Sequence, residues 1–118
     1  MIREKEEAAT LSEQIIHDVV GGARKTLGDK LSSVVLFGSV ARGDEQPESD
    51  VDLALLVNRE LTREERSEML SFFSDLWMRT DLFFAPIDIE VGKFEAWGRV
   101  LPLYQNIRRE GIVLWNAV

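Results

Sequence analysis

The feature that most constrains this chain is a pair of short apolar runs, residues 34–37 and 53–57, with a polar segment between them. Runs of this length, bounded by turn residues, predict buried β-strands. Gly38-Ser39 follows the first run directly, and Asp50 and Asp52 stand at the start of the second. Side chains alternate along a strand, so the two carboxylates share one face.

The aspartates suggest a site for divalent cations. Ions in a two-metal phosphoryl-transfer site lie about 3.5–4 Å apart, a spacing that Asp50 and Asp52 can hold if a third acid closes the cage. Asp88 is the natural third acid because it lies on the polar face of a later predicted strand, and Glu90, of the same parity, is the alternative. The chain has no cysteine and a single histidine, so oxygen ligands and ions such as Mg²⁺, Mn²⁺ or Ca²⁺ are favoured.

The Gly38-Ser39 pair suggests a site for phosphate. A glycine after a strand lets the backbone turn sharply and approach a ligand closely. If a short helix begins at Ser39, its free N–H groups and the Ser39 hydroxyl form an anion site. Arg42, one turn later, either adds a positive charge to the phosphates or pairs with the acidic loop. Each motif alone is common, but the two together, each next to a strand, predict a nucleoside-triphosphate site.

The remaining patterns predict an α+β fold with a small mixed sheet and a single domain spanning residues 1–118. Charged residues 1–9 are expected to be a solvated or frayed lead-in. Gly21-Gly22 predicts a kink or early end in the first helix. The expected helices and strands are a helix from a Thr10–Glu13 capping box to Gly28, strands 31–37, 51–57 and 87–91, a helix from a Thr62–Glu65 capping box to Thr80, a helix over 94–108 stopped by Gly111, and a tail 112–115 that adds an edge strand or packs on the core.

Composition limits the partners and the location. The net charge of −7 argues against binding long nucleic acid through a bulk positive field, although it allows a mononucleotide that arrives with metal. The N-terminus has no signal-peptide core, and no apolar run approaches the roughly 18 residues of a membrane span. We therefore expect a cytoplasmic protein.

The motifs resemble those of the polymerase-β-like nucleotidyltransferases. The strings FGSVARG (residues 37–43) and SDVDL (49–53) look like the minimal nucleotidyltransferase (MNT) branch, and a looser likeness extends to the ending RREGIVL (108–114). The resemblance implies the nucleotidyltransferase fold and Mg²⁺-dependent transfer of a nucleoside monophosphate from a triphosphate, with two metal ions expected.

The same resemblance implies roles for individual residues. It assigns phosphate binding to Gly38 and Ser39 and metal binding to Asp50 and Asp52, and its third carboxylate matches Asp88 best. These assignments agree with the phosphate site and the divalent-cation site that the residue types and their spacing predict.

MNT proteins are often encoded beside a helical HEPN-domain protein and act as its antitoxin, in some pairs by transferring AMP onto it. The resemblance therefore implies ATP as the nucleotide and a HEPN-type protein as the acceptor. The alternative is a non-catalytic antitoxin or binding module that neutralises its partner by direct contact. Base preference and homo-oligomerisation stay open.

Overall fold

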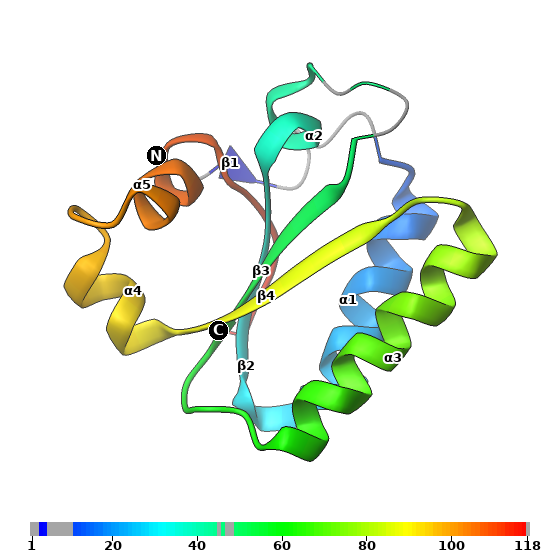
Figure 1. Cartoon of the computed structure of the whole chain (residues 1–118), viewed down its shortest axis with the longest axis horizontal. Helices are drawn as coiled ribbons and strands as arrows, with labels where there is room; N and C mark the ends of the chain where they lie inside the picture. The colour runs from blue at the N-terminus through cyan, green and yellow to red at the C-terminus, as the bar shows by residue number, and fades with distance from the viewer. Residues whose placement is uncertain (1–2, 5–10, 45, 47–48, 118) are drawn as a thin grey trace.

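A computed structural model of the chain describes residues 3–4, 11–44, 46 and 49–117. Its strands form a five-stranded sheet in the order β1-β5-β2-β3-β4, with helices packed on both sides (Figure 1). The strands are β1 (Arg3–Glu4), β2 (Leu31–Phe37), β3 (Val51–Val57), β4 (Phe84–Glu90) and β5 (Ile112–Asn116). The helices are α1 (Glu13–Leu27), α2 (Gly38–Arg42), α3 (Arg63–Thr80), α4 (Val91–Trp97) and α5 (Pro102–Glu110), with a 3₁₀ turn, η2 (Gly28–Lys30), after α1.

The sheet is mixed, which confirms the predicted α+β class. Strand β2 runs antiparallel to β3 and β5, whereas the pairs β3–β4 and β1–β5 are parallel. In the β2–β3 pair, Phe37 at the end of β2 lies opposite Asp52 at the start of β3. The Gly38-Ser39 turn and the two aspartates are therefore brought to the same end of the sheet.

Helices cover the two faces of the sheet. Figure 1 shows α1 and α3 on one side of the strands and α4 and α5 on the other. Alternate residues of β3 serve the two layers: Leu53 and Leu55 join the cluster formed with α1 and α3, whereas Ala54 and Leu56 join the cluster formed with α4 and α5. The middle of β3 is buried on both faces, as the sequence predicted.

Helix α1 differs from its prediction in two ways. Its N-cap is Ser12, whose hydroxyl accepts a hydrogen bond from the Ile15 N–H, in place of the predicted Thr10, which lies outside the described residues. The helix also continues through Gly21-Gly22 without ending. An ideal Cβ on Gly22 would lie 1.8 Å from the Phe72 ring, so this glycine allows α1 and α3 to pack closely.

The capping box at the start of α3 is confirmed. The Thr62 hydroxyl accepts from the Glu65 N–H, and the Glu65 carboxylate accepts from the Thr62 N–H. Glu65 also pairs with Lys30, just before β2. Two hydrogen bonds to the Glu65 carboxylate lower its pKa to about 2: the bond from Lys30 has the larger effect, and the bond from the Thr62 N–H has the next largest. This contact fixes the first turn of α3 against the start of β2.

The C-terminal part corrects two predicted boundaries. Strand β4 covers Phe84–Glu90 rather than 87–91, and it accommodates Pro86 because it is an edge strand. The single helix predicted over 94–108 is two helices, because Pro102 begins α5 at a position where a missing N–H costs nothing. The tail predicted as a strand or core segment is β5, which pairs with β2.

The predicted lead-in, residues 1–9, lies outside the described residues except for Arg3–Glu4, which form β1 beside β5. Over the part of the chain that the structure describes, every helix is too short or too polar to cross a lipid bilayer.

Candidate active site

Strand β2 ends in a turn that requires glycine. Gly38 has φ +78°, in the left-handed region that disfavours residues with a Cβ. An ideal Cβ on Gly38 would lie 2.1 Å from Asp52 Oδ2. The backbone of the turn therefore approaches the Asp52 carboxylate more closely than any other residue type permits.

Negative charges crowd around Asp52. Its side chain is half-buried, whereas Asp50, just before β3, is exposed. Burial, and then the charges of Asp50 and Glu110, raise the pKa of the Asp52 carboxyl, while Arg42 acts in the opposite direction. A cation beside Asp52 would relieve this repulsion.

Arg42 pairs with two acids in this structure: Asp44 of the acidic loop, as in one of its two predicted arrangements, and Glu110 of α5, a partner outside the loop. Its Nη1 atom lies 3.0 Å from Glu110 Oε2, and its Nε atom lies 3.3 Å from Asp44 Oδ2. These partners, Glu110 first, raise the pKa of the guanidinium. Ser39, half-buried in α2, contributes its carbonyl as acceptor for the Asp44 N–H. The structure therefore brings Gly38, Ser39 and Arg42 to the same end of the sheet as the aspartates.

Asp88 lies in a different place. In the parallel β3–β4 pair, Ala85 is opposite Asp52, whereas Asp88 is opposite Leu55. Asp88 is thus three residues further along, roughly 10 Å at the usual rise of a strand. Paired residues share a face, so Asp88 faces the α1 and α3 layer with Leu55, while Asp52 lies on the other face.

The surroundings of Asp88 explain its position. Its Oδ2 atom lies 2.9 Å from Arg66 Nη2 on α3, and this hydrogen bond lowers the pKa of the Asp88 carboxyl. Glu90, the alternative third acid, has the same parity as Asp88 and lies on the same face. Among the described residues no group of three acids is placed to hold a metal ion. The predicted cage of Asp50, Asp52 and Asp88 is not assembled in this structure.

Glu110, to which the sequence analysis assigned no role, is the additional acid beside Asp52. It is the last residue of α5, and its Oε1 atom accepts a hydrogen bond from the Gly38 N–H at 3.0 Å. The sequence holds one signal for it: an anion in the last turn of a helix opposes the helix dipole. Because the dipole of its own helix disfavours an acid at that position, directly before the helix-ending Gly111, the sequence indicates that Glu110 is stabilised by a group outside α5.

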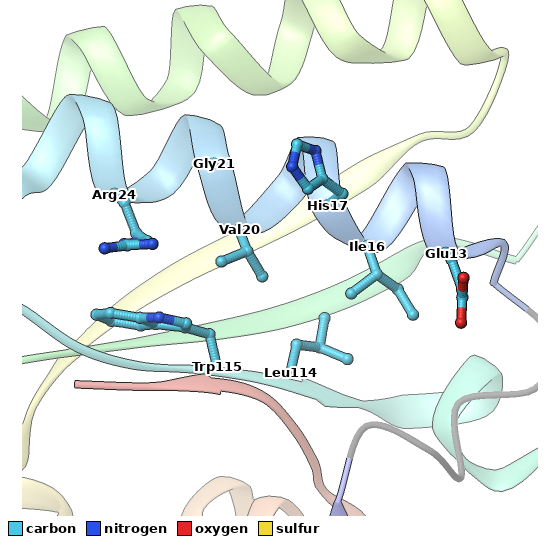
Figure 2. Close-up of a pocket in the computed structure, with 8 residues that line it drawn as sticks. All are labelled: Glu13, Ile16, His17, Val20, Gly21, Arg24, Leu114 and Trp115. Atoms are coloured by element: carbon cyan, nitrogen blue, oxygen red, sulfur yellow. The ribbon is translucent and has the colours of Figure 1, made fainter. Parts of the chain in front are cut away.

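A separate groove of about 480 Å³ lies between α1 and β5 (Figure 2). Ile16, Val20 and Leu114 point into it, and the Arg24 guanidinium lies 4.9 Å from the centre of a Trp115 ring. None of the predicted site residues lines this groove, which is on the α1 side of the sheet. We assign no catalytic part to it.

Comparison with known proteins identifies the family. The family model described as "Polymerase beta, Nucleotidyltransferase" matches residues 24–117. The chain belongs to this family. It is a nucleotidyltransferase, in agreement with the motifs around Gly38 and Asp50 and with the mixed sheet.

Three relatives give the membership more detail. A protein of Methanocaldococcus jannaschii named "Putative protein adenylyltransferase" is 38% identical over 74 residues, 63% of this chain and 75% of that protein. A toxin–antitoxin crystal structure with AMP-PNP is similar with TM-score 0.61 and 22% identity, over 86% of this chain and 73% of that one. A structure of a tri-AMPylated Shewanella oneidensis HEPN toxin in complex with MNT antitoxin gives TM-score 0.61 and 20% identity, over 91% and 74%. At these identities the two structures support the nucleotidyltransferase fold.

The Gly38 turn can be tested with a matched pair of substitutions. Gly38 and Gly43 have nearly equal φ values, +78° and +79°, but an added Cβ meets Asp52 at Gly38 and nothing within 4 Å at Gly43. Gly43→Ala should lower the free energy of unfolding by about 1–2 kcal/mol, the cost of a left-handed residue. Gly38→Ala should lower it further, because the Asp52 carboxylate must also move. Urea unfolding measures both, and equal losses would contradict the close approach.

Removing the negative charge of Asp52 on β3 and of Asp88 on β4 should change the stability of the fold in opposite directions. The raised pKa of Asp52 means that its ionised form is disfavoured in the fold, so stability is lost as the pH rises through the folded pKa. The lowered pKa of Asp88 means that its ionised form stabilises the fold, and this is lost as the pH falls from 3.8 through the folded pKa. Asp52→Asn should therefore raise the melting temperature at pH 7 and Asp88→Asn should lower it. Thermal unfolding at pH 7 and pH 3 checks this, and shifts of the same sign at pH 7 would contradict it.

Proposed function

We propose that this protein transfers AMP from ATP onto a hydroxyl group of an acceptor protein and releases pyrophosphate. The observation that supports this most directly is the contact between the Gly38 turn and the Asp52 carboxylate. A turn suited to phosphate and a carboxylate pair suited to metal adjoin there, as binding of a metal–triphosphate requires. The relative named as a protein adenylyltransferase supports AMP as the transferred group.

The donor set around Asp52 fits a hard divalent cation. Mg²⁺ is usually held by one or two carboxylates together with substrate phosphates and water. Asp50 and Asp52 supply such a pair, and the repulsion that raises the pKa of Asp52 would be relieved by a cation. We propose that the two residues hold Mg²⁺, with two ions expected and Mn²⁺ as the alternative. Bound there, the ions would neutralise charge on the triphosphate.

The protein's own groups then have distinct tasks. Gly38 and Ser39, with Arg42, bind the β- and γ-phosphates and place the α-phosphorus in front of the acceptor hydroxyl. The hydroxyl oxygen forms a bond to the α-phosphorus, the bond to the pyrophosphate oxygen breaks, and the hydroxyl proton is released. Asp88 has no part in this scheme, because its carboxylate lies on the other face and pairs with Arg66.

The acceptor that we propose is a HEPN-type protein. A structure similar in fold holds an AMPylated HEPN toxin with an MNT antitoxin. The negative net charge of this chain favours a protein acceptor over long nucleic acid. In this scheme the chain acts as the antitoxin of a toxin–antitoxin pair.

A second candidate function is neutralisation of such a partner by contact alone. The end of α4 and its connection to α5 expose apolar side chains, with Trp97 52% and Val100 62% accessible. Exposed apolar groups of this kind are suited to a protein interface. Neutralisation of a co-expressed HEPN-type toxin that survives Asp52→Asn would favour contact over transfer.

Transfer can be measured directly with ATP labelled at the α-phosphate, Mg²⁺ and a HEPN-type acceptor. Asp50→Asn and Asp52→Asn should reduce labelling about a hundredfold or more, the typical effect of losing a group that stabilises transition-state charge. Asp88→Asn, at a temperature where circular dichroism shows it folded, should keep labelling. Labelling that persists in Asp52→Asn would refute transfer at this site. Loss of labelling in the folded Asp88→Asn variant would show that Asp88 takes part in catalysis.

A further inference from the structure

The Glu110 carboxylate is bound by two groups at the Gly38 turn. Its Oε1 atom accepts from the Gly38 N–H at 3.0 Å, and the Arg42 Nη1 atom lies 3.1 Å from Oε1 and 3.0 Å from Oε2. The Glu110 side chain is 13% exposed and its bond from the Gly38 N–H is partly buried, whereas the Arg42 side chain is 46% exposed and its bonds to Glu110 lie at the surface. A backbone N–H at a glycine turn and a guanidinium are also donors that bind phosphate oxygens.

The charge of Glu110 is unfavourable in two other respects. It stands at the C-terminus of α5, where the helix dipole disfavours an anion. It also adds to the negative potential that raises the pKa of Asp52. The bonds to Gly38 and Arg42 offset both effects, and they are bonds that a phosphate group can replace.

We infer that Glu110 competes with the triphosphate for the Gly38 N–H and the Arg42 guanidinium. In the nucleotide-free protein it holds the turn and the arginine in place, and it is displaced when phosphate binds. After transfer it competes with pyrophosphate for the same donors and so favours release of that product. This inference rests on the proposed binding of a nucleoside triphosphate at Gly38.

The substitution Glu110→Gln distinguishes two roles of Glu110: competition with phosphate for the Gly38 N–H and Arg42, and structural support of the Gly38 turn. Glutamine has nearly the same shape, and its amide oxygen can still accept from the Gly38 N–H, but it lacks the charge that binds Arg42 and repels phosphate. Competition predicts tighter phosphate binding in this variant, and support of the turn predicts weaker binding. Glu68→Gln, on the exposed side of α3, is the control for the same change in net charge.

The test is isothermal titration of wild type, Glu110→Gln and Glu68→Gln with Mg²⁺ and either a non-hydrolysable ATP analogue or inorganic pyrophosphate. Glu110→Gln should bind both roughly five- to tenfold more tightly than the other two proteins, the scale expected when a charge-assisted hydrogen bond no longer competes. Equal or weaker binding would overturn the inference and leave the nucleotide site intact. Absence of binding in all three proteins would overturn the proposed function and the inference together.

A measurement on the wild-type protein avoids dependence on the variant. The backbone amide resonance of Gly38 reports its acceptor, which the inference changes from carboxylate to phosphate. Saturating magnesium pyrophosphate should shift this resonance and that of the Arg42 Nε–H together. Saturable binding that leaves both resonances in place would overturn the inference.

Discussion

The antiparallel pairing of β2 with β3 is the interaction on which the site depends. Because Phe37 pairs with Asp52, the turn that leaves β2 and the carboxylates that open β3 are fixed at one end of the sheet. Leu53 and Leu55 pack with α1 and α3, whereas Ala54 and Leu56 pack with α4 and α5, so a slip by one residue would exchange these side chains between two cores of different shape. Core packing therefore sets the register that places Gly38 against Asp52.

The site concentrates charge at the edge of an otherwise apolar fold. Asp50 and Glu110 repel the Asp52 carboxylate, and Arg42 offsets part of that repulsion. Such an arrangement is costly in a resting protein and is suited to binding a metal–triphosphate. In the nucleotide-free protein, Glu110 accepts hydrogen bonds from the donors that we infer bind phosphate in the nucleotide-bound protein. The opposite behaviour of Asp88, stabilised by Arg66, marks it as part of the α3 interface.

Sequence reasoning succeeded where the determinants are local. Alternation and turn residues predicted β2 and β3, and the short connection between them made Gly38 and Asp52 neighbours. It failed where a long connection intervenes: the register of β4 is set by the packing of α3, and parity alone did not show which face Asp88 takes. Pro102 offered a signal for the break between α4 and α5 that the apolar spacing masked. The position of Glu110 in the last turn of a helix indicates a partner outside α5, but only the return of α5 to the sheet shows that this partner is the Gly38 turn.

We propose that metal and triphosphate bind together at Gly38, Asp50 and Asp52. Paramagnetic broadening by Mn²⁺ in the presence of a non-hydrolysable ATP analogue tests it directly in the wild-type protein. Backbone amide signals should weaken most at these three residues and much less at Glu90 and Trp115. Broadening centred on Glu90 or on the groove beside Trp115 would contradict it.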